Sequence, residues 1–249
     1  MGLTGRTAVV TGGASGIGRG ICLRLARDGA DVAIFDLDRH GAEEVAAEVA
    51  KLGRRALGIE VDVASSASVA RAVERVHAEL GKVQILVNDA GIGGLQPFLE
   101  MSEADWDRYL GVHLKGTFNC ARALVADMVA AGWGRVVNVA STAGLNGAGP
   151  GLTHYAAAKG GIIAFSKALA HEVGPFGVTV NAIAPGMIDT PMSRRSPRAD
   201  ELFARTARHT PIKRVGTPDD IAAACAYLAS EEAGFVTGQV LSPNGGGWM

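Results

Sequence analysis

Short apolar runs alternate with longer amphipathic segments along the whole 249-residue chain. The short runs are rich in Val, Ile and Ala and are apolar on both faces, which is typical of parallel strands covered by helices. We expect seven strands, at Arg6–Thr11, Asp31–Asp36, Ala56–Val61, Val83–Asn88, Gly134–Ser141, Val178–Ala184 and Gln239–Ser242. Six segments between the strands have helical periodicity, namely Gly16–Gly29, Arg39–Gly53, Ser65–Gly81, Ser102–Gly132, Tyr155–Phe176 and Thr217–Ser230.

The repeated strand–helix alternation predicts an α/β fold of the Rossmann type. We expect a doubly wound, seven-stranded and mainly parallel sheet with helices on both faces. With no linker or repeat in sight, residues 1–249 are expected to form a single domain that binds a dinucleotide and catalyses a reaction. Arg194–Thr210 interrupts the alternation with Pro, Ser and many charges. This segment is either a helical flap over a pocket or a surface excursion.

Composition narrows the classes of protein. The chain is 48% hydrophobic and carries a formal net charge of -1, which argues against disorder and against recruitment of nucleic acid. No apolar run approaches the ~20 residues of a membrane span, so a cytoplasmic protein without a membrane partner is expected. Cys22, Cys120 and Cys225 are far apart and form no CxxC pair, so neither a disulfide framework nor a metal site is expected.

A glycine-rich turn follows the first expected strand. Thr11–Gly18 reads TGGASGIG and leads into a helix. Glycine allows a tight turn and a close approach of backbone to a pyrophosphate, and the helix N-terminus offers free N–H groups to anions. The spacing matches neither G-x-G-x-x-G nor a Walker A loop. The turn is therefore either a phosphate cradle or simply structural.

Asp36 ends the second expected strand, about 20 residues after the glycines, where a carboxylate accepts hydrogen bonds from the adenosine ribose. Such a carboxylate would repel a 2′-phosphate, so we expect NAD rather than NADP as the cofactor. The alternative is an ordinary turn aspartate at a strand end. Arg39 lies nearby in the sequence, and a small shift would bring it to a 2′-phosphate.

Three polar residues suggest acid–base chemistry. Tyr155 and Lys159 are four residues apart on an expected helix and so share a face. A free tyrosine has a pKa of about 10, and a nearby cation favours its phenolate. Ser141 ends the fifth expected strand, at the edge where open α/β sheets bind ligands, and its hydroxyl can hydrogen-bond a substrate oxygen. A strand-capping role is the plainer interpretation of Ser141.

Together these motifs resemble those of the short-chain dehydrogenase/reductase family over essentially the whole chain. The motifs are Thr11–Gly18, Asp62-Val63, Asn88-Asp89-Ala90-Gly91, Ser141, Tyr155 with Lys159, and Pro185-Gly186 with Thr190. The resemblance implies an NAD-dependent alcohol dehydrogenase or ketoreductase in which Tyr155 is the acid/base, Lys159 lowers its pKa and Ser141 orients the substrate. It implies cofactor contacts from Gly12, Ser15, Ile17, Gly18, Asp36, Leu37, Asp62, Val63, Asn88, Ala90, Gly91, Tyr155, Lys159, Pro185, Gly186, Ile188 and Thr190. It also implies a homotetramer.

Two positions depart from the family pattern. The usual Asn-Asn-Ala-Gly has Asp89 as its second residue, to which we assign no role. His113 stands where the family usually has an Asn that helps to hold a proton-relay water. Histidine can donate and accept, and titrates near neutrality, so His113 either serves the relay or is a buried residue that supports its helix.

The substrate is expected among the loops Gly93–Phe98, Thr142–Thr153 and Met187–Thr210. They carry Leu95, Phe98, Leu145, Leu152, Met187 and Met192 and few fixed charges. We therefore expect an apolar or cyclic secondary alcohol, or its ketone. The alternative is a 3-oxoacyl thioester of an acyl carrier protein or coenzyme A, with Arg194, Arg195 and Arg198 meeting the carrier phosphates. A non-catalytic NAD-binding regulator is a remote third possibility.

Overall fold

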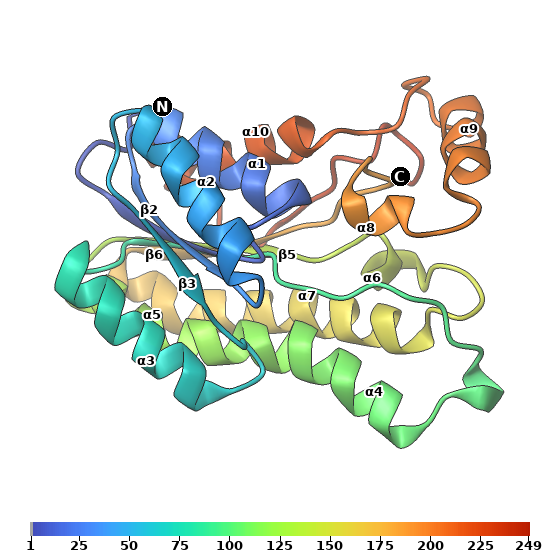
Figure 1. Cartoon of the computed structure of the whole chain (residues 1–249), viewed down its shortest axis with the longest axis horizontal. Helices are drawn as coiled ribbons and strands as arrows, with labels where there is room; N and C mark the ends of the chain where they lie inside the picture. The colour runs from blue at the N-terminus through green and yellow to red at the C-terminus, as the bar shows by residue number, and fades with distance from the viewer. Residues whose placement is uncertain (1) are drawn as a thin grey trace.

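A computed structural model describes residues 2–249. Seven parallel strands form one sheet in the order β3-β2-β1-β4-β5-β6-β7 (Figure 1). They are β1 (Thr7–Thr11), β2 (Asp31–Asp36), β3 (Ala56–Glu60), β4 (Ile85–Asn88), β5 (Gly134–Val139), β6 (Val178–Ile183) and β7 (Val240–Leu241). The predicted Rossmann-type, doubly wound architecture is confirmed, and the sheet is parallel throughout.

The strand order reverses at β1, which lies between β2 and β4. Val9 of β1 pairs with Ala33 on one side and with Leu86 on the other. In open α/β sheets the chain leaves these two neighbours in opposite directions, and a crevice opens at their carboxyl ends. The fold therefore places the ends of β1, β2, β4 and β5 around one crevice.

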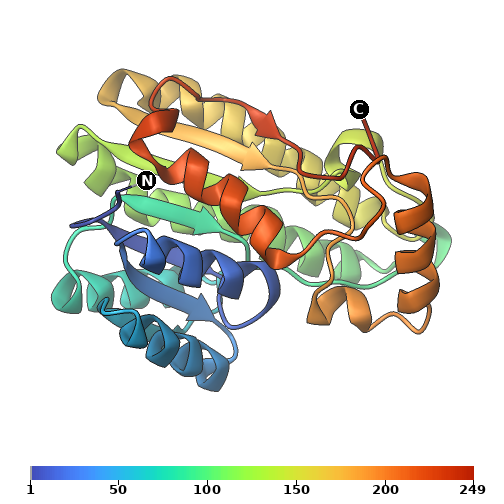
Figure 2. The same ribbon diagram turned by 90° about the horizontal axis from the view of Figure 1, so that it is seen from above.

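Helices cover both faces of the sheet (Figures 1 and 2). One face carries α1 (Gly16–Arg27), α2 (Arg39–Lys51) and α10 (Pro218–Ala229); the other carries α3 (Ser66–Glu79), α4 (Glu103–Leu110), α5 (Gly116–Ala131) and α7 (Thr153–Val173). Each face has its own apolar core, with Ile34 in the first and Phe35 in the second. This alternation explains why the strands are apolar on both sides.

The expected helix Ser102–Gly132 is not continuous. After α4 the chain forms a π-helical turn, η2 (Gly111–Lys115), before α5 begins. A π turn is a local widening that periodicity does not reveal, and such turns are frequent at functional sites. The expected helix at Tyr155 begins two residues earlier, at Thr153, so Tyr155 lies within its first turn.

Further short helices lie at the carboxyl edge of the sheet. They are α6 (Ala143–Asn146), α8 (Pro191–Arg194) and α9 (Ala199–His209), and the C-terminal tail lies beside α9 (Figure 2). The interruption at Arg194–Thr210 is therefore largely helical, and its role as a mobile flap remains a prediction. Three-residue 3₁₀ turns occur at Phe98–Glu100, Gly174–Phe176 and Glu231–Ala233.

Residues 2–249 also bear on the expectations about cysteines, metal ligands and membrane spans. The three cysteines are buried and unpaired. No cluster of potential metal ligands is found in that range, and none of its helices combines the length and apolarity needed to cross a bilayer.

Candidate active site

A cavity of about 390 Å³ opens at the carboxyl ends of β1, β2, β4 and β5. Every predicted site residue lines it except Gly18 and Asn88. Asn88 is buried, and its Nδ2 donates to Asn138 Oδ1 at 2.8 Å, so it ties β4 to β5. Gly18 packs against the Gly12 carbonyl, where a side chain would collide. Both residues therefore support the residues that line the cavity, without lining it themselves.

The glycine-rich turn presents an uncapped helix N-terminus to this cavity. Ser15 precedes α1, and its side chain makes no capping hydrogen bond. Gly16 has φ +55°, and a Cβ there would stand 3.5 Å from Thr190 Cβ, across the cavity. A side chain at Gly16 would therefore enter the cavity that Gly16 and Thr190 line. These features fit the pyrophosphate of a dinucleotide.

Asp36 is fixed at the end of β2. Its Oδ2 accepts from the Ala14 N–H at 3.0 Å and its Oδ1 from the Asp38 N–H at 3.0 Å. Leu37 beside it is exposed and lines the cavity. Arg39, the residue that could have met a 2′-phosphate, instead pairs with Glu43 at 2.8 Å. The Asp36 carboxylate therefore borders this end of the cavity, while Arg39 is paired with Glu43.

Asp62 and Val63, which the resemblance assigned to the adenine, form another part of the cavity wall. Asp62 Oδ1 accepts from the Ala64 N–H at 2.9 Å. The Val63 carbonyl accepts from Asn119 Nδ2 of α5 at 2.8 Å. This buried amide holds the loop after β3 against the helix layer and fixes the position of the Val63 side chain.

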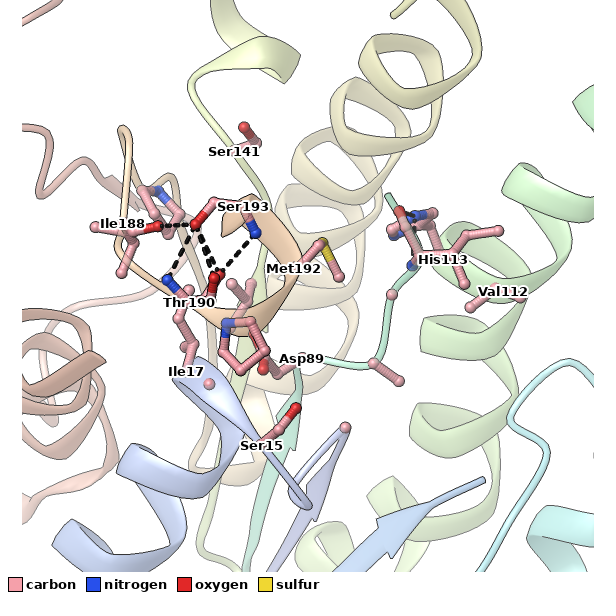
Figure 3. Close-up of a pocket in the computed structure, with 18 of the residues that line it drawn as sticks. Ser15, Ile17, Asp89, Val112, His113, Ser141, Ile188, Thr190, Met192 and Ser193 are labelled. Atoms are coloured by element: carbon pink, nitrogen blue, oxygen red, sulfur yellow. Dashed lines mark hydrogen bonds between the residues drawn. The ribbon is translucent and has the colours of Figure 1, made fainter. Parts of the chain in front are cut away.

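The opposite wall is the loop after β6, which the resemblance assigned to the nicotinamide. Ser193 Oγ donates to the Ile188 carbonyl at 2.8 Å, and it also accepts from the Thr190 N–H at 3.0 Å. The Thr190 hydroxyl in turn accepts from the Ser193 N–H at 3.2 Å. Figure 3 shows this hydrogen-bond network of Thr190, Ser193 and Ile188 facing Ser15 and Ile17 across the cavity. The loop is therefore held in shape by its own polar groups.

Tyr155, Lys159 and Ser141 meet at the inner end of the cavity. Lys159 is buried, its Nζ donates to the Val139 carbonyl at 2.7 Å, and it stands 5.7 Å from the centre of the Tyr155 ring. Ser141 Oγ accepts from the Ala143 N–H at 3.1 Å. The phenol, the ammonium group and the hydroxyl thus come together from α7 and the end of β5.

Burial raises the pKa of the Tyr155 phenol, and the neighbouring Ser141 hydroxyl opposes that rise. Burial lowers the pKa of Lys159, and the charge of Asp89 opposes that fall. In this structure the apolar surroundings of the phenol therefore outweigh any lowering by Lys159. The lowering expected from the family resemblance remains a prediction.

His113 lies in the π turn and is 2% exposed. Its Nε2 is 3.0 Å from the Ile92 carbonyl oxygen and 3.2 Å from the Ile92 nitrogen. Its Nδ1 is buried without a hydrogen-bond partner within residues 2–249, and its ring meets the Tyr155 ring edge-on at 5.3 Å. Burial lowers the pKa of His113 to about 3, so the neutral ring stands beside the phenol.

A second cavity, of about 630 Å³, adjoins the first. The two share only Ser141, Tyr155, Gly186 and Met187. The second is otherwise lined from α6, α9 and the C-terminal tail by Thr142, Ala143, Asn146, Ala148, Leu152, Arg205, Thr206, His209, Thr210, Asn244, Gly247 and Trp248. The phenol and the serine hydroxyl therefore stand at the junction of two compartments.

Comparison with known proteins agrees with this geometry. A family model described as enoyl-(acyl carrier protein) reductase matches residues 12–247. The chain belongs to the short-chain dehydrogenase/reductase family. It is accordingly an oxidoreductase that acts on CH–OH groups with NAD or NADP as acceptor.

Similar members of the short-chain dehydrogenase/reductase family cover almost the whole chain. A (2S)-[(R)-hydroxy(phenyl)methyl]succinyl-CoA dehydrogenase subunit from Thauera aromatica is 43% identical, over 99% of this chain and 98% of its own. An acetoacetyl-CoA reductase from Cupriavidus necator is 41% identical, over 98% of each chain. A 3-oxoacyl-[acyl-carrier-protein] reductase from Chlamydia muridarum is 40% identical, again over 98% of each chain. Each name describes a thioester.

Asp89 is a charged residue of this site to which the sequence analysis assigned no role. Asp89 lines the first cavity, and a Cβ on Gly18 would stand 3.0 Å from its Oδ2. Burial raises the pKa of this carboxyl, while Lys159 and the Gly18 N–H oppose the rise. The signal was available, because a carboxylate directly after the apolar strand β4 falls at the ligand-binding edge.

The expected substrate loops require a correction. Leu152 and Met187 line the second cavity and Met192 the first, but Leu95, Phe98 and Leu145 line neither. Leu95 and Phe98 are more than 60% exposed, because their loop runs outside both cavities. Two of the three arginines expected to meet carrier phosphates are also engaged, Arg194 with Asp189 and Arg198 with Glu201. The basic residues of the second cavity, Arg205 and His209, were missed.

Proposed function

We propose that this enzyme uses NAD to interconvert a 3-hydroxyacyl thioester and the corresponding 3-oxoacyl thioester. The observation that carries the proposal is the position of Tyr155 and Ser141 at the junction of the two cavities. One cavity fits a dinucleotide, and the other provides space for a substrate. The reacting carbinol would meet the nicotinamide at that junction, and only there.

Asp36 supports NAD rather than NADP. Its carboxylate is already oriented by two backbone N–H groups, and an added 2′-phosphate would bring a second anion against it. Arg39 is paired with Glu43 and would have to leave that partner to neutralise the phosphate. The contacts of Gly12, Ser15 and Ile17 with the pyrophosphate, and those of the other predicted residues, belong to the same proposal.

Bound NAD supplies the acceptor for the hydride that leaves the carbinol carbon. In the oxidative direction the Tyr155 phenolate would take the proton of the substrate hydroxyl as the carbonyl forms. Ser141 donates a hydrogen bond to the substrate oxygen. Lys159 favours the phenolate by its charge. His113, through the Nδ1 that lacks a protein partner, holds the water that passes the proton onward.

The names of the relatives favour a thioester over the free apolar alcohol that the sequence first suggested. One relative is named for an acyl-carrier substrate and two for coenzyme A substrates. A cavity of about 630 Å³ is also large for a small alcohol and open to α9 and the C-terminal tail. A thioester can place its acyl group inside while its carrier remains outside.

The test is a comparison of purified enzyme with NAD or NADP and three alcohols: 3-hydroxybutyryl-coenzyme A, cyclohexanol and 1-phenylethanol. We expect kcat/KM with the thioester and NAD to exceed every other combination by at least about tenfold, which corresponds to about 1.4 kcal/mol of transition-state binding. Preference for either free alcohol would overturn the thioester assignment. Preference for NADP would overturn the role of Asp36.

We also propose that the enzyme is a homotetramer. Large apolar side chains remain exposed on elements that could pack between copies, including Phe118 of α5 and Phe235, Trp248 and Met249 near the C-terminus. Isolated apolar side chains are common on protein surfaces, so the number of copies needs direct measurement. Light scattering on a size-exclusion column is expected to give four chains, and a monomer would contradict the proposal.

A further inference from the structure

The second cavity is asymmetric in charge. Of the residues that line it, Arg205, His209 and Tyr155 are the ones that can ionise, and none is Asp or Glu. Arg205 and His209 both come from the last turns of α9, whereas Tyr155 comes from α7. Because Arg205 is always charged, the α9 side of the cavity is cationic and no carboxylate of the lining neutralises it.

Three other arginines around this segment, Arg194, Arg198 and Arg214, have carboxylate partners. Arg198 holds both oxygens of Glu201 at 2.8 Å, although Glu201 lies one turn before Arg205. Arg194 pairs with Asp189, and Arg214 with Asp220. The side chain of Arg205 makes no hydrogen bond or ion pair within residues 2–249, although its charge, after that of Arg198, helps to lower the pKa of Glu201. A guanidinium with five donors is therefore available to a ligand.

His209 lies one turn after Arg205 on α9, and its ring is held by the Arg205 backbone. Its Nδ1 lies 2.8 Å from the Arg205 carbonyl oxygen, and since a carbonyl only accepts, the proton is on Nδ1. The Nε2 atom is then the free edge of the ring and donates when the ring is protonated. Thr206, on the same helix, adds a neutral hydroxyl to the cavity wall. The α9 side of the cavity thus presents a charged guanidinium, an imidazole and a neutral hydroxyl, from Arg205, His209 and Thr206.

We infer that Arg205, assisted by His209, binds an anionic group of the substrate and so selects alcohols that carry a carboxylate or phosphate. The inference rests on the proposed function, because it uses the same cavity and the same junction at Tyr155. Two sources can supply the anion: a carboxylate at the far end of the acyl chain, or a phosphate of the coenzyme A carrier. Bidentate pairing with guanidinium suits either one.

The test compares Arg205→Gln with the matched control Arg208→Gln. Arg208 lies on the same helix and is exposed, but it does not line the cavity. The substrates are the coenzyme A and N-acetylcysteamine thioesters of 3-hydroxybutyrate and of 3-hydroxyadipate. The N-acetylcysteamine esters lack phosphates, and only the adipyl esters carry the extra carboxylate.

For Arg205→Gln we expect KM to rise about tenfold or more for substrates that carry the recognised anion, with kcat within about twofold, as loss of a charge-assisted hydrogen bond predicts. Arg208→Gln should match the wild type. A rise confined to the coenzyme A esters identifies the phosphate, and one confined to the adipyl esters identifies the carboxylate. Equal KM values for both variants on all four substrates would overturn the inference.

A binding measurement separates this result from the proposed function. Calorimetric titration of the NADH-loaded protein with coenzyme A and with glutarate requires no turnover. One of these anions should bind the wild type and Arg208→Gln, and should bind Arg205→Gln at least about tenfold more weakly. If no thioester is oxidised but this difference is found, the thioester assignment fails and the anion site stands. If neither anion distinguishes the variants, the anion site is wrong.

Discussion

The two cavities that meet at Tyr155 are built in different ways. The first is formed largely by strand ends and backbone: Asp36 is held by two N–H groups, and the glycine-rich turn presents bare backbone to the cavity. The second is formed by side chains of α6, α9 and the C-terminal tail, segments that are distant in sequence. The first is fixed by the sheet, whereas the second depends on how surface helices pack.

This difference corresponds to the two ligands: the first cavity suits a cofactor that many enzymes share, and the second suits the substrate of this enzyme. A dinucleotide presents the same pyrophosphate and ribose groups in every enzyme that uses it, so a rigid, backbone-lined cavity suits it. Substrates differ, and side chains on loops and short helices can change without disturbing the sheet. Substitutions in the first cavity should therefore affect NAD, those in the second should affect the substrate, and those at the junction should affect turnover.

The largest effect is expected at the junction. Tyr155→Phe removes the proton-transfer group and should lower kcat by about 10²- to 10⁴-fold, the usual contribution of general acid–base catalysis. Binding of NADH, followed by its fluorescence, should remain within about twofold of the wild type. Unchanged turnover by the folded variant would remove the proposed mechanism.

Substitution of the strand-end carboxylate should affect only the first cavity. Asp36→Asn keeps the shape but removes the charge, and should shift the ratio of kcat/KM for NAD over NADP about tenfold toward NADP. The KM for the alcohol should not move. Steady-state kinetics with both cofactors measures this, and a change confined to the alcohol would contradict the division between the cavities.

A smaller effect is expected at the back of the second cavity. Trp248 is 40% exposed and lines that cavity, so Trp248→Ala should raise the KM of the thioester by about two- to fivefold through lost apolar contact. The KM for NAD should stay the same. Progress curves at saturating NAD and at saturating thioester measure the two constants separately.

Asp89 gives the first cavity a pH dependence. Because burial raises the pKa of its carboxyl, the folded protein holds this proton more tightly than the unfolded chain does, and stability from this group falls as pH rises from about 4 toward neutrality. The ionisable groups around it are Lys159, Asp36, Tyr155, Cys22 and Cys225.

Asp89→Asn removes that titration while keeping the size of the side chain. We expect the melting temperature of the variant, relative to the wild type, to increase between pH 5 and pH 8 by a few degrees, an estimate of about 1 kcal/mol for a protein of this size. Differential scanning calorimetry in buffers of equal ionic strength measures the difference. A constant difference across that range would show that Asp89 does not titrate there.

The smallest effect is expected for a conservative change at His113. If its role is to hold a relay water, His113→Asn should keep kcat within about twofold, whereas His113→Leu, which neither donates nor accepts, should lower kcat about tenfold or more. Equal activity of the two variants would favour the plainer interpretation, a buried residue that supports its helix. Circular dichroism melts check that both variants fold.

The sequence could predict much of the first cavity and little of the second. Apolar runs, strand-end residues such as Asp36, and the helical spacing of Tyr155 and Lys159 are local features, and periodicity with turn chemistry located them. The π turn at Gly111–Lys115 escaped detection because its pattern resembles an α-helix. Arg205 and Trp248 could not be assigned to one cavity from sequence, because no local pattern relates α9 to the C-terminal tail. Leu95 and Phe98 were misplaced for the same reason.

The π turn also sets a limit on how this chain can vary. It accommodates residues that a regular helix would have to place elsewhere, and each residue of an α-helix turns the chain by about 100°. Loss of a single residue between 111 and 115 would let this stretch close into a regular α-helix, with α4 and α5 still in phase, and would move the imidazole away from the Ile92 backbone. A deletion in this segment should thus spare the packing of the two helices and still lower turnover, because it displaces the side chain at position 113.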